Sequence, residues 1–201
     1  GNAGLQNHNY YQKEKYEKIA HNGNKNAFEP TIGNLLNLKD ITVTLDSLFF
    51  LREVGCGSYG KVYLVHNQKR FYAIKTAEIE QMIKLKAMTE LYITEKKILF
   101  SIEHPFIVSI INTFKTKEYL LFLMEYVDGI TLKKLMSENN YHPRNLEQTK
   151  FICACLGSVL SYLQRKKIIH RDLKSENVMI THNGYVKVID FGAAKNISQR
   201  D

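Results

Sequence analysis

Short apolar runs rich in β-branched and aromatic residues alternate with polar turns through the middle of the chain. The runs "FFLREVG", "KVYLVHN" and "FYAIKTA" lie between residues 49 and 77, separated by glycines and by the polar turn Asn67-Gln68-Lys69. This pattern predicts an antiparallel meander. A helical periodicity follows over residues 78–102, after which "FIVSIINTFK" and "YLLFLMEYV" return to strand character. We therefore expect a small lobe of strands with one main helix.

The second half of the chain predicts a long helix. Its apolar residues recur in two adjacent rows, namely Phe151, Cys155, Val159 and Leu163 in one and Ile152, Leu156 and Leu160 in the other. Two such rows predict a helix that is buried on both. Asn145 and Gln148 have the spacing of a capping box at its start. Residues 1–44, in contrast, are rich in Asn, Lys and Gly, which indicates a polar extension with a short helix around residues 10–19.

A β-hairpin is predicted within "HRDLKSENVMITHNGYVKVIDFG", residues 170–192, because two β-branched runs flank Asn183-Gly184. If these two residues form the turn, both need a positive φ angle. His182 then faces Tyr185, and Asn177 lies opposite Asp190. Opposed residues on antiparallel strands are about 5 Å apart at Cα, and magnesium prefers oxygen ligands. The hairpin therefore predicts a magnesium site that Asn177 and Asp190 share.

Composition and charge narrow the class of protein. With 44% hydrophobic and 24% charged residues among 201, the chain is not disordered throughout. We find no apolar run long enough to span a bilayer and no signal peptide. The three cysteines are an odd number, and Cys153 and Cys155 point to different sides of a helix, so we expect reduced thiols in the cytoplasm. The lysines behind the net charge of +8 are scattered, which favours a solvated surface over a nucleic-acid groove.

The glycine-rich stretch "GCGSYG", Gly55 to Gly60, matches G-x-G-x-x-G. In a dinucleotide-binding fold the last glycine opens a helix, and that alternative stays open on the motif alone. Here another β-rich run, residues 61–65, follows at once. We therefore place the glycines at the bend of a hairpin, where backbone N–H groups can cover a polyphosphate.

A buried ion pair is predicted between the third strand and the helix that follows it. Glu95 is flanked at helical spacing by Leu91, Ile98, Leu99 and Ile102, which places its carboxylate on the buried face. A buried charge needs a partner, and Lys75 in "YAIKTA" is the candidate. The alternative leaves Glu95 at the helix edge and Lys75 in solvent.

Asp172, Lys174, Asn177 and Asp190 surround the predicted hairpin. A single Asp in a loop is explained equally well as a turn cap. The combination is different, since it offers a carboxylate for the substrate hydroxyl, a cation for a transferring phosphoryl group and two oxygen ligands for a metal. With a glycine-rich phosphate cover, these are the groups that in-line phosphoryl transfer requires.

These motifs resemble the eukaryotic protein kinases. "GCGSYGKV", "AIK", Glu95, "HRDLKSEN" and "DFG" occur in the order and approximate spacing of that family. The resemblance implies an α+β fold of two lobes, with an antiparallel-sheet N-lobe containing one main helix and a mainly helical C-lobe. We assign residues 1–44 to the extension, 45–127 to the N-lobe and 128–201 to a partial C-lobe that ends in the activation segment. Because A-P-E does not follow the "DFG", the resemblance implies a fragment or a truncated relative.

The resemblance also assigns roles, with ATP and magnesium as cofactors. It implies that Lys75 binds the α- and β-phosphates with Glu95 as its partner, that Asp172 is the catalytic aspartate, that Lys174 contacts phosphate and that Asn177 and Asp190 bind magnesium. Met124 resembles the gatekeeper of the hinge "FLMEYVDG", and Leu99, Ile110, His170 and Phe191 resemble an internal spine. The implied nucleotide-binding residues are Gly55, Cys56, Gly57, Ser58, Gly60, Val62, Ala73, Lys75, Met124, Glu125, Val127, Thr131 and Met179.

Lys174, two residues after Asp172, is similar to the serine/threonine kinases. Within them, "TEKKILFSIEHPFIVSI" and "NGYVKVIDFGAAK" resemble the cyclic-nucleotide-dependent kinases and their relatives. Thr131 departs from that pattern where many of these enzymes carry an acidic residue, whereas Glu176, which implies a basic peptide, is retained. The expected function is ATP-dependent phosphoryl transfer to serine or threonine of proteins. The alternative is a non-catalytic ATP-binding or scaffold module, and the sequence identifies no regulatory partner.

Overall fold

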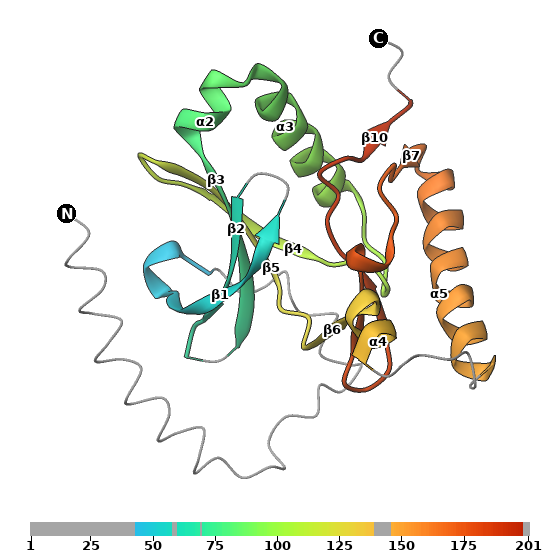
Figure 1. Cartoon of the computed structure of the whole chain (residues 1–201). Helices are drawn as coiled ribbons and strands as arrows, with labels where there is room; N and C mark the ends of the chain where they lie inside the picture. Colours follow the sequence, from blue (N-terminus) through green and yellow to red (C-terminus); the bar gives the residue numbers. More distant parts are fainter. Residues whose placement is uncertain (1–42, 58–59, 69, 139–145, 199–201) are drawn as a thin grey trace, which may run out of the picture.

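A five-stranded antiparallel sheet with the order β1-β2-β3-β5-β4 forms the first half of the computed structural model (Figure 1). The structure describes residues 43–57, 60–68, 70–138 and 146–198. The sheet strands are β1 (Phe49–Gly57), β2 (Gly60–His66), β3 (Phe71–Glu78), β4 (Ile110–Lys115) and β5 (Tyr119–Glu125), preceded by the short 3-10 helix η2 (Leu45–Ser47). The predicted meander is therefore present. The β4 strand begins four residues later than the apolar run that starts at Phe106.

Two helices, α2 (Ile79–Lys84) and α3 (Lys86–Ser101), stand where the sequence predicted one over residues 78–102. The prediction is wrong at Leu85, whose φ of −117° and ψ of 87° interrupt the helix. The Thr89 hydroxyl donates to the Met82 carbonyl at 2.9 Å, an acceptor that a continuous helix would pair with the N–H of residue 86. Because Met82 is buried and Leu85 is 56% exposed, the break turns α2 onto the sheet and leaves Leu85 in solvent.

The second half contains two described helices and two small sheets. The helices are α4 (Leu132–Glu138) and α5 (Leu146–Arg165), with the 3-10 helix η3 (Ser175–Asn177). One sheet has the order β6-β8-β9 and the other pairs β10 with β7. These strands are β6 (Gly129–Thr131), β7 (Ile168–Ile169), β8 (Val178–Thr181), β9 (Val186–Val188) and β10 (Lys195–Asn196). In Figure 1 the large sheet and α5 lie on opposite sides of the molecule, with the red C-terminal segment between them. Within the described ranges, no helix combines the length and hydropathy that crossing a bilayer requires.

The β8–β9 hairpin differs from its prediction by one residue. Ile180 pairs with Val186 and Val178 with Val188, so His182, Asn183 and Gly184 form a three-residue loop. Only Gly184 in this loop has a positive φ, of 80°, and its N–H donates to the Thr181 carbonyl at 2.8 Å. A loop of three residues that ends in one left-handed residue is a common hairpin connection. Asn177 therefore faces Ile189, whose N–H it accepts at 2.9 Å, and not Asp190.

The α5 helix is buried on one row and half exposed on the other. Cys155, Val159 and Leu163 are buried, whereas Phe151, at the start of the same row, is 45% exposed. Leu160 in the second row is 48% exposed. The prediction of deep burial on two faces is therefore wrong for the structure as described. The predicted separation of the thiols is confirmed, since Cys153 is exposed and Cys155 is buried.

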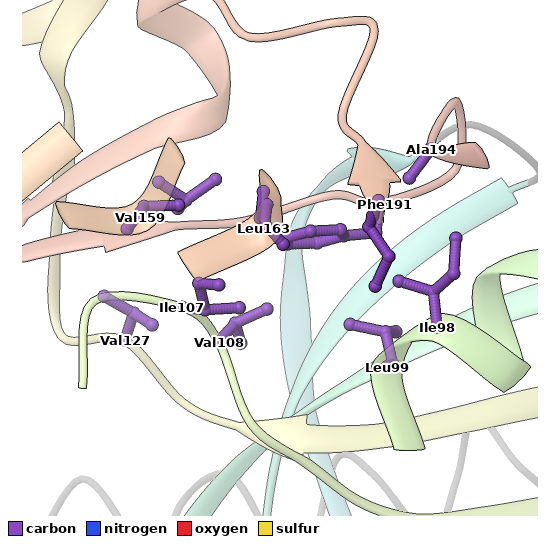
Figure 2. Close-up of a cluster of buried hydrophobic side chains, with 11 residues drawn as sticks. Ile98, Leu99, Ile107, Val108, Val127, Val159, Leu163, Phe191 and Ala194 are labelled. Carbon is purple, nitrogen blue, oxygen red and sulfur yellow. The ribbon is translucent and has the colours of Figure 1, made fainter. Parts of the chain in front are cut away.

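One hydrophobic cluster joins the two halves of the molecule (Figure 2). Phe191, which is fully buried, lies between Leu163 of α5 and the pair Ile98 and Leu99 of α3. The cluster contains Ile98, Leu99, Ile107, Val108, Val127, Val159, Leu163, Ile168, Val188, Phe191 and Ala194. Because its members come from both halves, the position of α3 relative to the C-terminal segment is fixed by close packing.

A second cluster lies under the sheet and includes Val43, which is 2% exposed. Asn112 donates to the Val43 carbonyl at 3.3 Å. The sequence placed Val43 in the polar extension, but this residue is part of the packed N-lobe. The helix predicted around residues 10–19, the cap at Asn145 and the loop residue Ser58 lie outside the described residues.

Candidate active site

Three charged side chains from distant segments meet beside the large sheet. The Lys75 Nζ of β3 lies 2.8 and 3.1 Å from the two carboxylate oxygens of Glu95 on α3, and 3.0 Å from Asp190 Oδ1. The side chains of Lys75 and Glu95 are 5% and 1% exposed. The predicted ion pair is therefore present, and the alternative of two solvated charges is wrong. The buried Lys75 ammonium therefore forms ion pairs with two carboxylates, those of Glu95 and Asp190.

The environment of Glu95 explains why this pairing matters. Burial raises the pKa of the Glu95 carboxyl, and the Lys75 ammonium opposes that rise. Tyr92, one turn earlier, stacks on Phe122 with ring centroids 4.4 Å apart. Burial, together with the Glu95 charge, raises the pKa of Tyr92 to about 12. Lys75 is therefore the group that stabilises the ionised form of Glu95 inside an otherwise apolar wall.

The glycine-rich stretch forms the bend between β1 and β2, where Gly57 pairs with Gly60. A strand follows the last glycine, as predicted, so the dinucleotide-fold alternative is wrong. A Cβ added at Gly60 would clash with the carbonyl oxygen of Thr76, so only glycine fits against β3 at this point. Cys56 is exposed beside this bend.

The β2, β3 and β5 strands bring three apolar side chains onto the face that carries Lys75. Val62 pairs directly with Lys75, and Ala73 pairs with Met124. Opposed residues share a face, as do residues two apart in one strand. The predicted arrangement of Val62, Ala73 and Lys75 on one face is confirmed by this register, and Met124 joins them from β5.

Asp172 is held by donors from both sides of its loop. Lys174 Nζ lies 2.8 Å from its Oδ2, and Asn177 Nδ2 donates to the same oxygen at 3.0 Å and to the Asp172 carbonyl at 2.9 Å. Asn177 is 7% exposed, whereas the Asp172 side chain is 41% exposed. Three of the residues predicted from the sequence therefore form one hydrogen-bonded group, and its carboxylate reaches solvent.

His170 connects this group to the buried cluster. Its ring contacts the Phe191 ring in a tilted arrangement, with centroids 4.7 Å apart and an interplanar angle of 57°, and its Nδ1 accepts the Asp172 N–H at 3.4 Å. Burial lowers the pKa of His170, although the charges of Asp190 and Asp172 oppose the shift. A neutral ring is required for that accepted hydrogen bond. Its Nε2 is buried without a hydrogen-bond partner among the described residues.

Asp190 and Arg171 both adopt left-handed backbone conformations, with φ angles of 61° and 64°. Such angles are uncommon for residues other than glycine. At Asp190 this conformation interrupts the alternation of side chains between the two faces of the strand. The Asp190 side chain therefore points to Lys75, although the predicted register of the hairpin was wrong by one residue. Its Oδ1 also accepts the Gly192 N–H at 3.1 Å. At Arg171 it places the guanidinium Nε 2.6 Å from the Ala193 carbonyl, which ties the two loops together.

The hinge residues lie at the end of β5. Val127 is buried in the cluster of Figure 2, and Met124 and Met179 both pack against that cluster. Glu125 donates its N–H to the Ser109 carbonyl at 3.0 Å, and its side chain accepts the Ser109 N–H at 2.8 Å. The hinge strand is therefore fastened to the segment that precedes β4.

Sequence reasoning missed Lys187, which contacts Glu125 at 2.7 Å. The signal was available, because Lys187 is a single charge inside the apolar run "YVKVI". It also missed the close approach at Gly129, where an added Cβ would clash with the Ile180 carbonyl of the neighbouring strand.

Thr131 and Glu176 lie at the outer edge of the site. The Thr131 hydroxyl accepts the Lys134 N–H at 3.2 Å at the start of α4, so its side chain is used as a helix cap. Glu176 accepts Lys133 Nζ at 3.0 Å and the Ser175 hydroxyl at 3.0 Å. These bonds, with Lys133 the largest cause, lower the pKa of Glu176 to about 2.

The donors available to a metal are few. Within the described part of the chain, no group of three or more His, Cys, Asp or Glu side chains is arranged to hold a metal ion. Asp190 and Asn177 offer one carboxylate and one amide oxygen, since the Asn177 nitrogen is the atom that donates to Asp172. Magnesium is commonly bound by one or two carboxylates together with substrate phosphates. The donor set therefore fits a metal that arrives with a nucleotide.

The protein kinase domain family matches residues 49–201 of the chain. The cAMP-dependent protein kinase type 3 of Saccharomyces cerevisiae is 36% identical over 77% of this chain and 38% of its own length. The cAMP-dependent protein kinase catalytic subunit of Dictyostelium discoideum is 38% identical over 75% of this chain and 23% of its own. The RAC serine/threonine-protein kinase of Drosophila melanogaster is 37% identical over 76% of this chain and 25% of its own length.

The chain therefore belongs to the protein kinase domain family, and the predicted fold and family are confirmed. Its relatives include cyclic-nucleotide-dependent and RAC serine/threonine kinases, as the sequence analysis expected. The chain spans between about a quarter and two fifths of the length of the relatives described above.

Proposed function

We propose that this chain belongs to an enzyme that transfers the γ-phosphoryl group of ATP to serine or threonine of protein substrates. The observation that carries the proposal is the contact of Lys75 with both Glu95 and Asp190, at 2.8 and 3.0 Å. This contact brings β3, α3 and the "DFG" segment into one arrangement, in which a buried ammonium is presented beside two carboxylates. Phosphoryl transfer depends mainly on such positioning and on electrostatic stabilisation.

The nucleotide would lie between the large sheet and β8. Its phosphates would meet the backbone N–H groups of residues 55–60 and the Lys75 ammonium. The adenine would lie between Val62 and Ala73 on one side and Met179 on the other, beside the hinge backbone at Glu125 and Val127. Met124 limits the depth of this space and Thr131 borders the ribose. The shared strand face of Val62, Ala73 and Met124 supports this placement.

Asp190 and Asn177 would hold magnesium against the phosphates, and the metal would neutralise charge that develops on them. Asp172 would orient and deprotonate the substrate hydroxyl, because its carboxylate is exposed to solvent and fixed by Asn177. Lys174 contacts this carboxylate at 2.8 Å and would turn to the transferring phosphoryl group when substrate is present.

The substrate is proposed to be a protein, and the Glu176 carboxylate is the candidate partner for a basic side chain near the acceptor residue. A cytoplasmic location is supported by two thiols of α5, since Cys153 and Cys155 are free and lie on different sides of the helix. Disulfides form in oxidising compartments, whereas the cytosol keeps such groups reduced.

The replacement Asp172→Asn tests the reaction. In the full-length gene product it should lower peptide phosphorylation by about a hundredfold or more, because a general base is lost. The affinity for ATP should change by less than about twofold, since Asp172 acts on the substrate hydroxyl. Asp46→Asn is a matched control, because Asp46 is an exposed residue of η2 and is not among the proposed site residues.

Two outcomes would contradict the proposal in different ways. Wild-type turnover in the Asp172→Asn enzyme would remove Asp172 from the reaction. ATP binding without phosphorylation in the wild-type protein, tested against a degenerate peptide library, would instead support the non-catalytic nucleotide-binding module.

A further inference from the structure

Lys187 is a charged residue in the middle of a buried strand. It is 9% exposed, and its neighbours in β9, Val186 and Val188, are fully buried. Its Nζ lies 2.7 Å from Glu125 Oε1 and 3.3 Å from the Ile107 carbonyl oxygen. Burying an ammonium is costly unless it is paired and hydrogen-bonded. The contacts of Lys187 therefore define a specific polar site in this region.

Glu125, the partner, is the last residue of β5 and is itself fixed in place. The two hydrogen bonds that it exchanges with Ser109 hold both its backbone and its carboxylate. Oε1 accepts from Ser109 and from Lys187, and the side chain is 13% exposed. Movement of Lys187 would therefore move the end of β5, where the hinge begins.

The segment between α3 and β4 completes the junction. Val188 donates to the Phe106 carbonyl at 2.8 Å and accepts the Val108 N–H at 2.9 Å, so residues 106–108 lie along β9. Lys187 thus lies where three segments meet: β9, the connection from α3 to β4, and the end of β5. Lys187 is not among the nucleotide-binding residues proposed above.

We propose that Lys187 is a positioning residue that sets the width of the adenine site, an inference that rests on the proposed nucleotide-binding function. Lys187 pairs with Met179 across β8 and β9, so both side chains lie on one face. Glu125 follows Met124, which pairs with Ala73. The Lys187–Glu125 ion pair therefore connects β9 with β5. These strands are the partners of β8, which carries the Met179 wall of the site, and of β3, which carries the Ala73 wall.

The experiment separates the adenine part of the site from the phosphate part. Calorimetry on the 201-residue chain would measure the binding of ATP and of tripolyphosphate, each with magnesium. Lys187→Met should weaken ATP binding by about tenfold, because a small misplacement of the binding groups has large effects. Tripolyphosphate binding should remain within about twofold, since the contacts described for Lys187 go to Glu125 and Ile107, which are not phosphate-binding residues. General misfolding would weaken both ligands equally and would overturn the proposal.

Three further variants serve as controls. Lys187→Arg keeps the charge and should retain most of the ATP affinity. Lys117→Met, at an exposed position between β4 and β5, should bind both ligands as the wild type does. The double variant Lys187→Met/Glu125→Gln removes both charges and keeps an acceptor for the Ser109 N–H. It should melt near the wild-type temperature but still bind ATP weakly. Full recovery of ATP affinity in it would show that Lys187 acts on stability alone and would overturn the proposal.

A readout without ligand distinguishes this proposal from the proposed function. If the wild-type chain binds neither ATP nor tripolyphosphate, the nucleotide-binding function fails. Amide exchange at Ser109 and Glu125 still reports the positioning: faster exchange in Lys187→Met than in Lys117→Met supports it, and equal exchange overturns it.

Discussion

At the scale of single residues, charge in an apolar setting was the most informative signal in the sequence. The pairing of Lys75 with Glu95 could be predicted because the apolar neighbours of Glu95 placed a carboxylate on a buried face. The direction of Asp190 could not be predicted from strand alternation. Its φ of 61° depends on the loop that follows and on Lys75, which is 115 positions away in sequence. Asp190 was correctly placed in one site with Lys75 because of its "DFG" motif. The prediction that it lies directly opposite Asn177 in the hairpin was wrong.

Glu176 leads to a prediction about pH. Lys133 is the largest of the causes that lower the pKa of Glu176 to about 2. The ion pair therefore stabilises the folded state above the ordinary carboxyl value of 4.5, and this stabilisation is lost as the pH falls towards 2. Lys133→Ala should therefore raise the Glu176 titration midpoint towards 4.5, as followed by carbon NMR of the carboxyl group. A midpoint that does not move would show that Lys133 does not bind Glu176 in solution.

The same replacement has a consequence for substrate choice in the full-length gene product. With Lys133 removed, the Glu176 carboxylate is available to an arginine of the peptide, so phosphorylation of arginine-containing peptides should rise relative to neutral ones. Lys134→Ala, one residue further along α4, is the control. Equal ratios for Lys133→Ala and the wild type would exclude this role of Lys133.

At the scale of elements, strands and helices could be predicted well and their connections less well. The meander followed from short β-rich runs, but the hairpin after η3 shifted by one residue because a single left-handed residue, Gly184, closes its loop. The Asn-Gly pair is compatible with both a two-residue and a three-residue loop. The packing of β8 and β9, and not the turn sequence alone, selects between them. Similarly, periodicity could not reveal the break at Leu85, which depends on burying Met82 under the sheet.

The hairpin loop yields a prediction that separates the two turn types. Gly184→Ala should lower the free energy of unfolding by about 1 kcal/mol through backbone strain alone, because its added Cβ would meet open space. Asn183→Ala should cost less than about 0.5 kcal/mol, as is usual for exposed positions. Urea unfolding of both variants provides the measurement. Equal losses would indicate the two-residue turn, in which both positions need a positive φ.

At the scale of the whole molecule, the sequence predicted two lobes but not how they are joined. The backbone pairing of residues 106–108 with β9 links segments about 80 positions apart, and no local pattern marks such a partner. Phe191 similarly completes a cluster that includes residues of α3, α5 and the hinge. The motif residues of the site were predictable because each carries its own chemistry, whereas the contacts that hold the lobes together depend on the complete fold.

The exposed apolar side chains of α5 predict how the chain behaves in solution. Leu160 is 48% exposed and Phe151 is 45% exposed, so we expect the 201-residue chain to self-associate and to phosphorylate peptides poorly. Leu160→Lys should shift the sedimentation profile towards the monomer. Ile83→Lys, which changes an equally apolar residue that is 72% exposed on α2, should not. A monodisperse and active wild-type chain in the same experiment would contradict this expectation.

The distance in sequence between Glu125 and Lys187 also gives the fold a temporal order during synthesis. Lys187 follows Glu125 by 62 residues. At ~5–20 residues per second, the ribosome adds it ~3–12 s later. All five strands of the large sheet precede residue 126, so the sheet can form while Glu125 still lacks its ammonium partner and residues 106–108 still lack β9. The nascent chain therefore passes through an interval with an acidic, incompletely covered sheet end, a surface that a chaperone can bind before β9 emerges.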